Sequence, residues 1–323
     1  MPSAVVFAYH NVGVRCLSVL LRHGIDVRLV VSHEDNPTEN IWFDSVKELA
    51  GKHGIPVITP DDPNTQAFVQ RIRDIAPDFI FSFYYRLMLK PALLNIPKHG
   101  AFNMHGSLLP KYRGRVPVNW AVINGETETG ATLHAMVEKP DAGDIYGQQS
   151  VPILPDDTAF EVFEKVTSAA ESVLELALPS IVTGAAIGIP QDLSKGSYFG
   201  GRKPEDGRID WNAAAQTIHN LVRGVAPPYP GAFCDLQGKR LRILRTKHVA
   251  EKPVDTCPLF GSSSPGIIAV GGNPKKGTSI HAVCGDGAVL TLLEIEVDGE
   301  TIGYDRFCAL FGVQSATQKI PVA

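Results

Sequence analysis

The chain has 323 residues, more than one small hydrophobic core usually organises, so we expect one large domain or two domains. Apolar residues make up 44% and charged residues 20%, the balance of an ordinary globular protein. No apolar stretch is long enough to cross a bilayer, and the first residues lack the basic region of a secretory signal. We therefore expect neither membrane insertion nor export.

The cysteines indicate neither a disulfide framework nor a metal site. Their number is odd, and no two of them are spaced as C-x-x-C. This usage predicts a reducing, cytoplasmic location, in which the thiols act as small buried apolar groups. The residues concerned are Cys16, Cys234, Cys257, Cys284 and Cys308.

A formal charge of −4 at pH 7 argues against a nucleic-acid partner. Proteins that bind nucleic acid usually carry a clustered basic surface. Basic residues gather here only at 111–115 and 239–247. Since a local patch can suffice, a tRNA-sized substrate stays open as an alternative.

The first half of the chain alternates short apolar runs with helical patterns. Cys16, Leu17 and Leu20 fall on one helical face, and Val46 with Leu49 marks a second helix. Apolar runs typical of buried strands lie at residues 4–8, 27–31, 79–83, 102–105 and 132–136. The alternation predicts an α/β fold with a doubly wound, mostly parallel sheet.

A long helical pattern follows these strands. Asp157 or Thr158 can cap it, and Pro179 should lie at or near its end. We expect residues 1–190 to form the first domain. The segment 191–204, rich in Gly, Ser and Pro, is predicted to be a linker.

Residues 205–323 have a different texture, with short β-like runs separated by Gly, Asn, Asp and Pro. The runs lie at 240–245, 266–270, 280–283 and 289–295. This pattern predicts a small β-domain resembling a barrel, with a loose tail from Thr317 onward.

The segment from Phe102 to Gly114, FNMHGSLLPKYRG, carries the clearest chemical signal. Asn103 and His105 are two apart on a predicted strand, so their side chains point to the same side. The carboxyl end of a strand in a doubly wound sheet is where ligands bind. Asp141, in the loop after the 132–136 strand, could reach the imidazole and favour its protonated form.

These residue types suit the transfer of an acyl group to an amine. The reaction needs a polarised carbonyl, a stabilised oxyanion, a route for the amine's proton and fixed geometry. Asn103 and His105 can donate hydrogen bonds, and Asp141 can accept a proton directly or through water. Taken one at a time, the same residues could be structural, since an isolated Asn-x-His more often satisfies backbone groups.

The pattern N-x-H-x-S-x-L-P-x-x-R-G followed by D-x-G-x-I resembles the signature of the 10-formyltetrahydrofolate-dependent formyltransferases. Segments 81–86, 119–130, 198–202 and 227–233 resemble the formyltransferase part of the bifunctional polymyxin-resistance proteins. The resemblance therefore covers nearly the whole chain. It implies the formyltransferase fold and formylation of UDP-4-amino-4-deoxy-L-arabinose in lipid A modification, with 10-formyltetrahydrofolate as co-substrate.

The resemblance also implies roles for the matching residues. His105 would be the catalytic acid, Asn103 would hold the oxyanion, and Asp141 would tune His105 and take up the proton. The folate would be bound by Leu87, Met88, Leu89, Val137, Glu138, Lys139, Pro140 and Asp141. The substrate would be contacted by Arg115, Tyr84, Ser107 and Arg113. His134 is interpreted as a strand residue with a satisfied side chain, and His10 and Asn11 as turn residues that could face the ligand crevice.

Three other activities compete with this one. A dTDP-amino-sugar could replace the UDP-sugar, methionyl-tRNA could be the acceptor, or the chain could bind folate or a nucleotide-sugar without turnover. The bifunctional proteins continue into an NAD-dependent decarboxylase, whereas this sequence ends at Ala323 and lacks G-x-G-x-x-G. We therefore expect formylation without NAD, metal or decarboxylation. The oligomeric state is left open.

Overall fold

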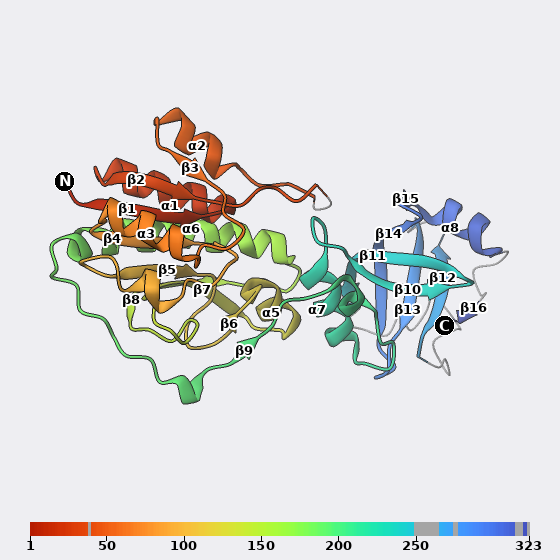
Figure 1. The fold of residues 1–323 in the computed structure, drawn as a ribbon. Coiled ribbons are helices and arrows are strands. Elements are labelled where there is room, and N and C mark those ends of the chain that lie inside the picture. Colours follow the sequence, from red (N-terminus) through yellow and green to blue (C-terminus); the bar gives the residue numbers. More distant parts are fainter. Residues whose placement is uncertain (38–39, 249–264, 274–276, 314–318, 322–323) are drawn as a thin grey trace. The chain divides into compact units, whose positions relative to one another are not determined.

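The computed structural model describes residues 1–323 except 38–39, 249–264, 274–276, 314–318 and 322–323. Cys257 lies outside the described residues. The chain divides into two compact units (Figure 1). Unit 1 comprises Met1–Val118, Glu128–Pro152 and Val162–Gly201, and unit 2 comprises Asn119–Thr127, Ile153–Glu161 and Arg202–Ala323.

Unit 1 is built on a seven-stranded sheet of order β3-β2-β1-β4-β5-β7-β8. The first five strands of this order are parallel, and β7 and β8 add antiparallel strands at one edge. Their bounds are β1 Ser3–Ala8, β2 Asp26–Val31, β3 Val57–Ile58, β4 Phe79–Phe83, β5 Ala101–His105, β7 Glu128–Ala135 and β8 Ile145–Pro152. This confirms the predicted mostly parallel α/β sheet.

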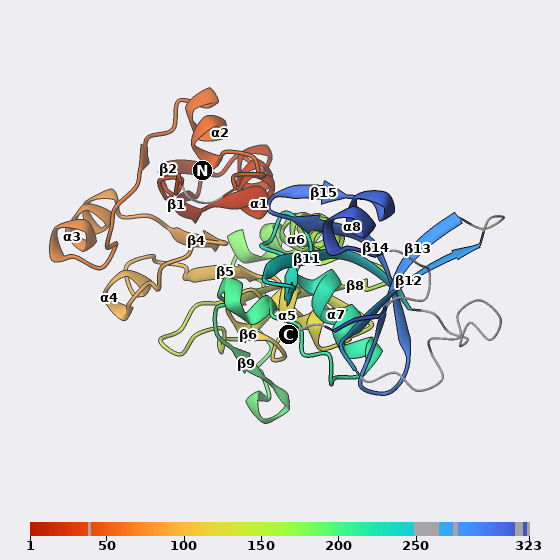
Figure 2. The same cartoon turned by 90° about the vertical axis from the view of Figure 1, so that its right-hand side faces the viewer.

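Helices cover both faces of this sheet because its central strands are apolar on both sides. Figure 2 shows α3 (Gln66–Ile75) and α4 (Pro91–Leu94) on one face, with α1 (His10–Arg22) and α6 (Ala159–Val182) on the other. Every residue of β1 and β4 is buried. Phe68, Val69 and Ile72 of α3 pack on alternate residues of β1, β2 and β4.

The two helices on the second face are joined by ion pairs at their exposed edges. Arg22 of α1 contacts both Glu171 and Glu175 of α6, at 3.1 and 2.8 Å. At the start of α6, the Thr158 hydroxyl accepts from the Glu161 backbone N–H at 3.3 Å, and the Glu161 carboxylate accepts from Thr158 N at 2.7 Å. This reciprocal cap stabilises the first turn. Pro179 lies inside the last turn, close to the helix end as predicted.

The segment predicted as a linker contains short regular elements. A 3₁₀ turn, η1, covers Leu193–Lys195, and strand β9 covers Tyr198–Phe199. Strand β9 pairs in parallel with β6 (Arg113–Gly114) as a separate two-stranded sheet. The backbone of the predicted linker thus pairs with the loop that follows β5.

Unit 2 contains a second, antiparallel sheet of order β10-β11-β14-β13-β12-β16, with β15 paired to β14. Its strands are β10 Ala232–Leu236, β11 Lys239–His248, β12 Ile267–Asn273, β13 Gly277–Val283, β14 Val289–Val297, β15 Glu300–Ile302 and β16 Lys319–Pro321. Among the described strands, the two ends of this order, β10 and β16, do not pair, so the sheet is open there and not a closed barrel. Strand β16 lies in the tail predicted to be loose.

Helices α7 (Ala215–Val225) and α8 (Tyr304–Phe311) pack on this sheet. Among the described residues, α2 (Val46–Lys52) of unit 1, α5 (Pro117–Ile123) and the 3₁₀ turn η2 (Pro204–Gly207) complete the helical elements. Ile218 and Val222 of α7 and Phe307 of α8 are buried in its core. Among the described cysteines, Cys16, Cys234 and Cys284 are buried and all four are free thiols. No helix in the described ranges is both long and apolar enough to cross a membrane.

Candidate active site

Three neighbouring parallel strands end at the same level. Ala8 of β1 is in register with Phe83 of β4, and Phe83 with Met104 of β5. The chain runs from β1 toward β3 in one direction and from β4 toward β5 in the other, so a topological switch point lies between β1 and β4. Ligands bind in such crevices, outside the carboxyl ends of the strands. Residues that follow these three strands are therefore the first candidates for function.

His105 ends β5 and is 6% exposed. Its Nε2 lies 2.8 Å from the Tyr112 carbonyl oxygen, which can only accept, so Nε2 carries a proton. Its Nδ1 lies 3.6 Å from Asp141 Oδ1. Nδ1 is thus the ring nitrogen that can gain or lose a proton while the bond to Tyr112 stays intact.

Asn103 and His134 face each other across the antiparallel pair β5–β7. His134 Nδ1 donates to the Ala135 carbonyl oxygen at 2.8 Å, so Nε2 is an acceptor in the neutral ring and a donor in the protonated ring. In the neutral ring it accepts from Asn103 Nδ2, 3.1 Å away, and in the protonated ring it can donate to Asp141 Oδ1, 3.5 Å away. An amide nitrogen has two N–H groups, so the second of them can serve a ligand oxygen.

Asp141 lies where these groups meet. Its Oδ1 is 3.6 Å from His105 Nδ1 and 3.5 Å from His134 Nε2, and its Oδ2 accepts from Gly114 N at 2.9 Å. Burial alone would raise the pKa of Asp141, but the charge of His105 and the contacts with His134 and Gly114 outweigh it and hold the pKa well below its usual range. The carboxylate therefore stays ionised.

The loop after β5 is held closely by its neighbours. A Cβ at Gly106 would lie 2.0 Å from the Tyr84 hydroxyl oxygen, so a side chain there would require Tyr84 to move. Tyr84 itself has a left-handed backbone, with φ of 58°. Ser107 is fully buried and donates to the Lys111 carbonyl oxygen at 2.7 Å. This bond assigns the Ser107 hydroxyl to holding the loop, which argues against its predicted direct contact with substrate.

The two arginines of this loop differ in environment. Arg113 is 9% exposed, and its Nε is shut off from solvent without a hydrogen-bond partner in the described part of the chain. Arg115 is exposed, and its Cδ would lie 3.7 Å from a Cβ added at Gly201. Arg113 lies between Tyr112 and Gly114, whose backbone atoms bind His105 and Asp141. Arg113 is therefore beside the histidine–aspartate pair.

The segments predicted to bind folate expose apolar side chains. Leu87, Met88 and Val137 are 38%, 55% and 45% exposed, whereas Leu89 is buried. Asn64 holds the first segment, since its Nδ2 donates to Met88 O at 2.9 Å and its Oδ1 accepts from Lys90 N at 2.8 Å. Exposed apolar groups on a fixed backbone suit contact with a flat, partly apolar ligand. Of the second segment, Glu138 and Lys139 are exposed and Pro140 is partly buried.

His10 occupies an aromatic enclosure at the end of β1. Its ring stacks on Phe43 with centroids 4.0 Å apart and lies edge-on to Trp42 and Phe163. Burial, with a smaller effect of the Arg86 charge, lowers the pKa of His10 to about 3. Its φ of 69° is unusual for a residue with a side chain and is a form of strain that gathers at functional sites. His10 is thus a neutral imidazole at the switch point.

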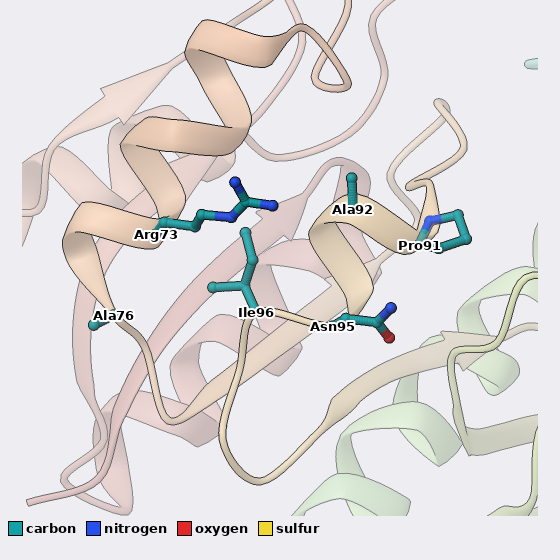
Figure 3. Close-up of a pocket in the computed structure, with 6 residues that line it drawn as sticks. All are labelled: Arg73, Ala76, Pro91, Ala92, Asn95 and Ile96. Carbon is teal, nitrogen blue, oxygen red and sulfur yellow. The ribbon is translucent and has the colours of Figure 1, made fainter.

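A separate hollow of about 430 Å³ lies between α3 and α4 (Figure 3). Arg73, Ala76, Pro91, Ala92, Asn95 and Ile96 line it. Ala76 precedes β4 and Ile96 precedes β5, so this hollow lies toward the amino ends of these strands. It contains none of the residues around His105, and we do not include it in the candidate active site.

The structure adds residues to this site that pattern reading did not select. His134 is a strand residue with a satisfied side chain, as interpreted from the sequence, and it also contacts the Asp141 carboxylate. Its place on the predicted strand at 132–136 was the available signal. Gln191, within the predicted linker, donates to backbone oxygens of Asp141 and Gly143. No local sequence pattern indicates that contact. Within the described ranges, no group of three or more His, Cys, Asp and Glu is arranged to hold a metal ion.

An amide donor, an imidazole and an ionised carboxylate around one strand end are the groups that acyl transfer to an amine requires. The family model described as formyl transferase matches residues 13–178, and that of the formyl transferase C-terminal domain matches residues 202–308. The first match covers half of the chain. The chain therefore belongs to the formyl transferase family. It is an enzyme of the formyltransferase class.

Solved structures share the fold at low sequence identity. An N-formyltransferase from Helicobacter canadensis, in complex with folinic acid and dTDP-3-aminofucose, is 20% identical, with a TM-score of 0.65 over 90% of this chain and 99% of that chain. WlaRD, a sugar 3N-formyl transferase studied with dTDP and 5-N-formyl-THF, is 19% identical, with a TM-score of 0.67 over 93% and 99%. A 4-N formyltransferase from Francisella tularensis is 20% identical, with a TM-score of 0.59 over 74% and 95%. At these identities the likeness shows a common fold.

Proposed function

We propose that this formyltransferase moves a formyl group from 10-formyltetrahydrofolate to the amine of a nucleotide-linked amino sugar in the cytoplasm. The observation that carries the proposal is the meeting of Asn103, His105 and Asp141 at the carboxyl end of β5. The sugar N-formyltransferases that share its fold support the choice of acceptor class. The exposed apolar side chains of Leu87, Met88 and Val137 fit a folate ring.

The donor supplies a formyl carbonyl carbon bonded to N10. As the sugar amine attacks that carbon, the second N–H of Asn103 and the Nδ1–H of protonated His105 stabilise the charge that develops on the carbonyl oxygen. The new C–N bond forms, the bond to N10 breaks, and the amine proton is passed on while N10 gains one. No covalent enzyme intermediate is needed.

The role of Asp141 follows from its lowered pKa. A carboxylate that holds its proton weakly is a poor place to store one. We assign Asp141 to stabilising the imidazolium of His105. The carboxylate relays the amine proton toward water. This shifts the emphasis of the sequence-based interpretation, in which Asp141 took up the proton.

Arg113 and Arg115 would bind the anionic groups of the acceptor. Arg113 is 9% exposed and lies in the chain between the residues that bind His105 and Asp141, and a diphosphate is a suitable partner for a guanidinium. Arg115 and Tyr84 stay proposed substrate contacts. For the folate, Val137, Glu138, Lys139 and Pro140 would complete the pocket wall opposite residues 87–89.

The basic strand β11 gives little support to a tRNA acceptor. Four of its basic side chains are neutralised by carboxylates within unit 2, which lowers the positive potential that phosphates would require. The pairs are Lys239–Asp298, Arg240–Asp235, Arg242–Glu296 and Arg245–Glu161. Methionyl-tRNA is therefore a weaker acceptor candidate than a nucleotide-sugar.

The particular acceptor that we propose is UDP-4-amino-4-deoxy-L-arabinose, which would place the enzyme in lipid A modification and polymyxin resistance. It rests on the resemblance of residues 81–86 and 198–202 to the polymyxin-resistance proteins. A dTDP-amino-sugar is the second candidate, because two proteins of the same fold were studied with dTDP ligands.

A panel of acceptors separates these possibilities. The protein is incubated with 10-formyltetrahydrofolate and, in separate reactions, the UDP-sugar, a dTDP-amino-sugar or charged initiator tRNA, and tetrahydrofolate release is measured. We expect the highest kcat/KM with the UDP-sugar. Higher kcat/KM with a dTDP-sugar would correct the nucleotide, and turnover with tRNA alone would contradict the amino-sugar proposal.

A further inference from the structure

The segment after α6 reaches the loop that carries Asp141. Ile145 and Ile189 form an antiparallel bridge, in which each backbone N–H donates to the carbonyl oxygen of the other residue. The N···O distances are 2.8 Å from Ile145 N and 2.9 Å from Ile189 N. In an antiparallel pair, the residue two before one partner lies opposite the residue two after the other partner. Gln191 is therefore placed opposite Gly143, two residues after Asp141.

The Gln191 side chain bridges this loop with a single nitrogen. Its Nε2 donates to the Asp141 carbonyl oxygen at 3.1 Å and to the Gly143 carbonyl oxygen at 2.6 Å. Both partners can only accept, so the amide orientation is determined by the contacts. Its Oε1 is buried without a hydrogen-bond partner among the described residues. A buried oxygen without a partner costs free energy, yet the amide is present at this position.

The two captured carbonyl groups belong to a strained turn. Asp141 has φ of 52°, a left-handed conformation that is costly for a residue with a side chain. Gly143 packs so tightly that a Cβ would lie 2.0 Å from the Ala135 carbonyl oxygen. The turn directs the Asp141 carboxylate to His105, His134 and the Gly114 N–H. Gln191 holds the backbone on both sides of Ala142 in that conformation.

We propose that Gln191 is a positioning residue for the Asp141 carboxylate. The inference rests on the proposed function, since it assigns Gln191 a part in the formyl-transfer site. Gln191 acts through Asp141. Without it, the turn relaxes and the carboxylate moves away from the imidazole groups that lower its pKa. A purely structural glutamine would affect stability and leave the titration of Asp141 unchanged.

The first measurement does not depend on turnover. The carboxyl titration of Asp141 is followed by ¹³C NMR in the wild type, in Gln191→Met, which removes the donor at similar volume, and in the matched control Gln216→Met. Gln216 lies on α7 and donates to Asn220. We expect the Asp141 pKa to rise toward its ordinary value in Gln191→Met only. An unchanged Asp141 titration in folded Gln191→Met would overturn the proposal.

The second measurement is a kinetic double-mutant cycle. In Gln191→Met we expect kcat to fall by about 10- to 100-fold, with KM for both substrates changed less than about twofold. In an Asp141→Asn background, the same substitution should have no further effect, because interacting residues are not additive. Additive losses would contradict action through Asp141.

If Gln191→Met does not fold, Gln191→Glu is used, because an ionised carboxylate of the same size cannot donate to either carbonyl. A wild type without formyl transfer would contradict the proposed function, while the Asp141 titration would still test this inference.

Discussion

At the scale of single residues, the site is defined by which nitrogen carries which proton. Tyr112 O keeps a proton on His105 Nε2, and Ala135 O keeps one on His134 Nδ1. Asp141 lies between the two remaining ring nitrogens. Spacing on a predicted strand indicated that Asn103 and His105 share a side. It could not indicate the proton positions, because these depend on carbonyl groups supplied by loops.

The first residue-scale prediction concerns His105. His105→Gln keeps a polar side chain but removes the exchangeable imidazole proton. We expect kcat to fall by about 10²- to 10⁴-fold, with little change in nucleotide-sugar binding. Steady-state kinetics and calorimetric titration measure the two effects. His53→Gln, at an exposed position outside the site, is the control. Activity retained in His105→Gln would remove His105 from the chemistry.

A second residue-scale prediction concerns the pH dependence of stability. The pKa of His10 is about 3 in the folded chain, against 6.5 for the ordinary residue. Between these values the unfolded chain binds the proton and the folded chain does not, so His10 makes stability fall as pH falls from 6.5 toward 3. The slope from one such group is at most about 1.4 kcal/mol per pH unit.

His10→Asn should reduce that slope, because asparagine tolerates the left-handed backbone and does not titrate in this range. Denaturant unfolding at several pH values between 4 and 7 measures it. His33, whose pKa is lowered to about 4 by burial, keeps its own contribution in both proteins. His53→Asn should retain the wild-type slope. An equal slope in His10→Asn and the wild type would mean that His10 is protonated normally.

At the scale of elements, short apolar runs predicted the strands of the first sheet. The run at 79–83 coincides with β4, and the run at 102–105 with all but the first residue of β5. The pairing of β6 with β9 was beyond prediction, because each strand has two residues and the two lie far apart in the sequence. Gln191 was missed for the same reason: its partners are backbone atoms of a distant loop.

The element-scale prediction tests the β6–β9 pair. A Cβ on Gly114 would lie 2.1 Å from Phe199 O, and its φ of 101° disfavours any side chain. Gly114→Ala should destabilise the protein by about 2–4 kcal/mol, the sum of overpacking and backbone strain. It should also lower kcat, because Gly114 N holds the Asp141 carboxylate.

The matched control is Gly54→Ala, where φ is 67° but no atom lies within 4 Å of the added Cβ. Backbone strain alone should cost about 1 kcal/mol there and leave kcat unchanged. Unfolding free energies and steady-state kinetics measure both variants. Equal destabilisation by the two substitutions would show that the β6–β9 contact is looser than the structure indicates.

At the scale of the whole molecule, the change from alternating helices and strands to short β-runs predicted an α/β region followed by a β-region, and the chain has both sheets. Composition could not show that residues 119–127 and 153–161 belong with the C-terminal compact unit. Helix α7 explains this membership: buried Arg223 donates to Leu154 O and Asp157 O at 3.3 and 3.1 Å, and Gly224 O accepts from Asn119 Nδ2 at 2.9 Å. Strand count could not show that this sheet is open between β10 and β16, because closure depends on how the end strands pair.

The central claim is that this formyltransferase passes its one-carbon group to a sugar amine. The most direct measurement uses 10-formyltetrahydrofolate labelled with ¹³C in the formyl group, together with UDP-4-amino-4-deoxy-L-arabinose. We predict that the label appears as a formamide on the sugar nitrogen, in equal amount to the tetrahydrofolate released, and that His105→Gln slows its appearance by about 10²- to 10⁴-fold. Label that stays on folate, or is released only as formate with every amino-sugar offered, would contradict the account.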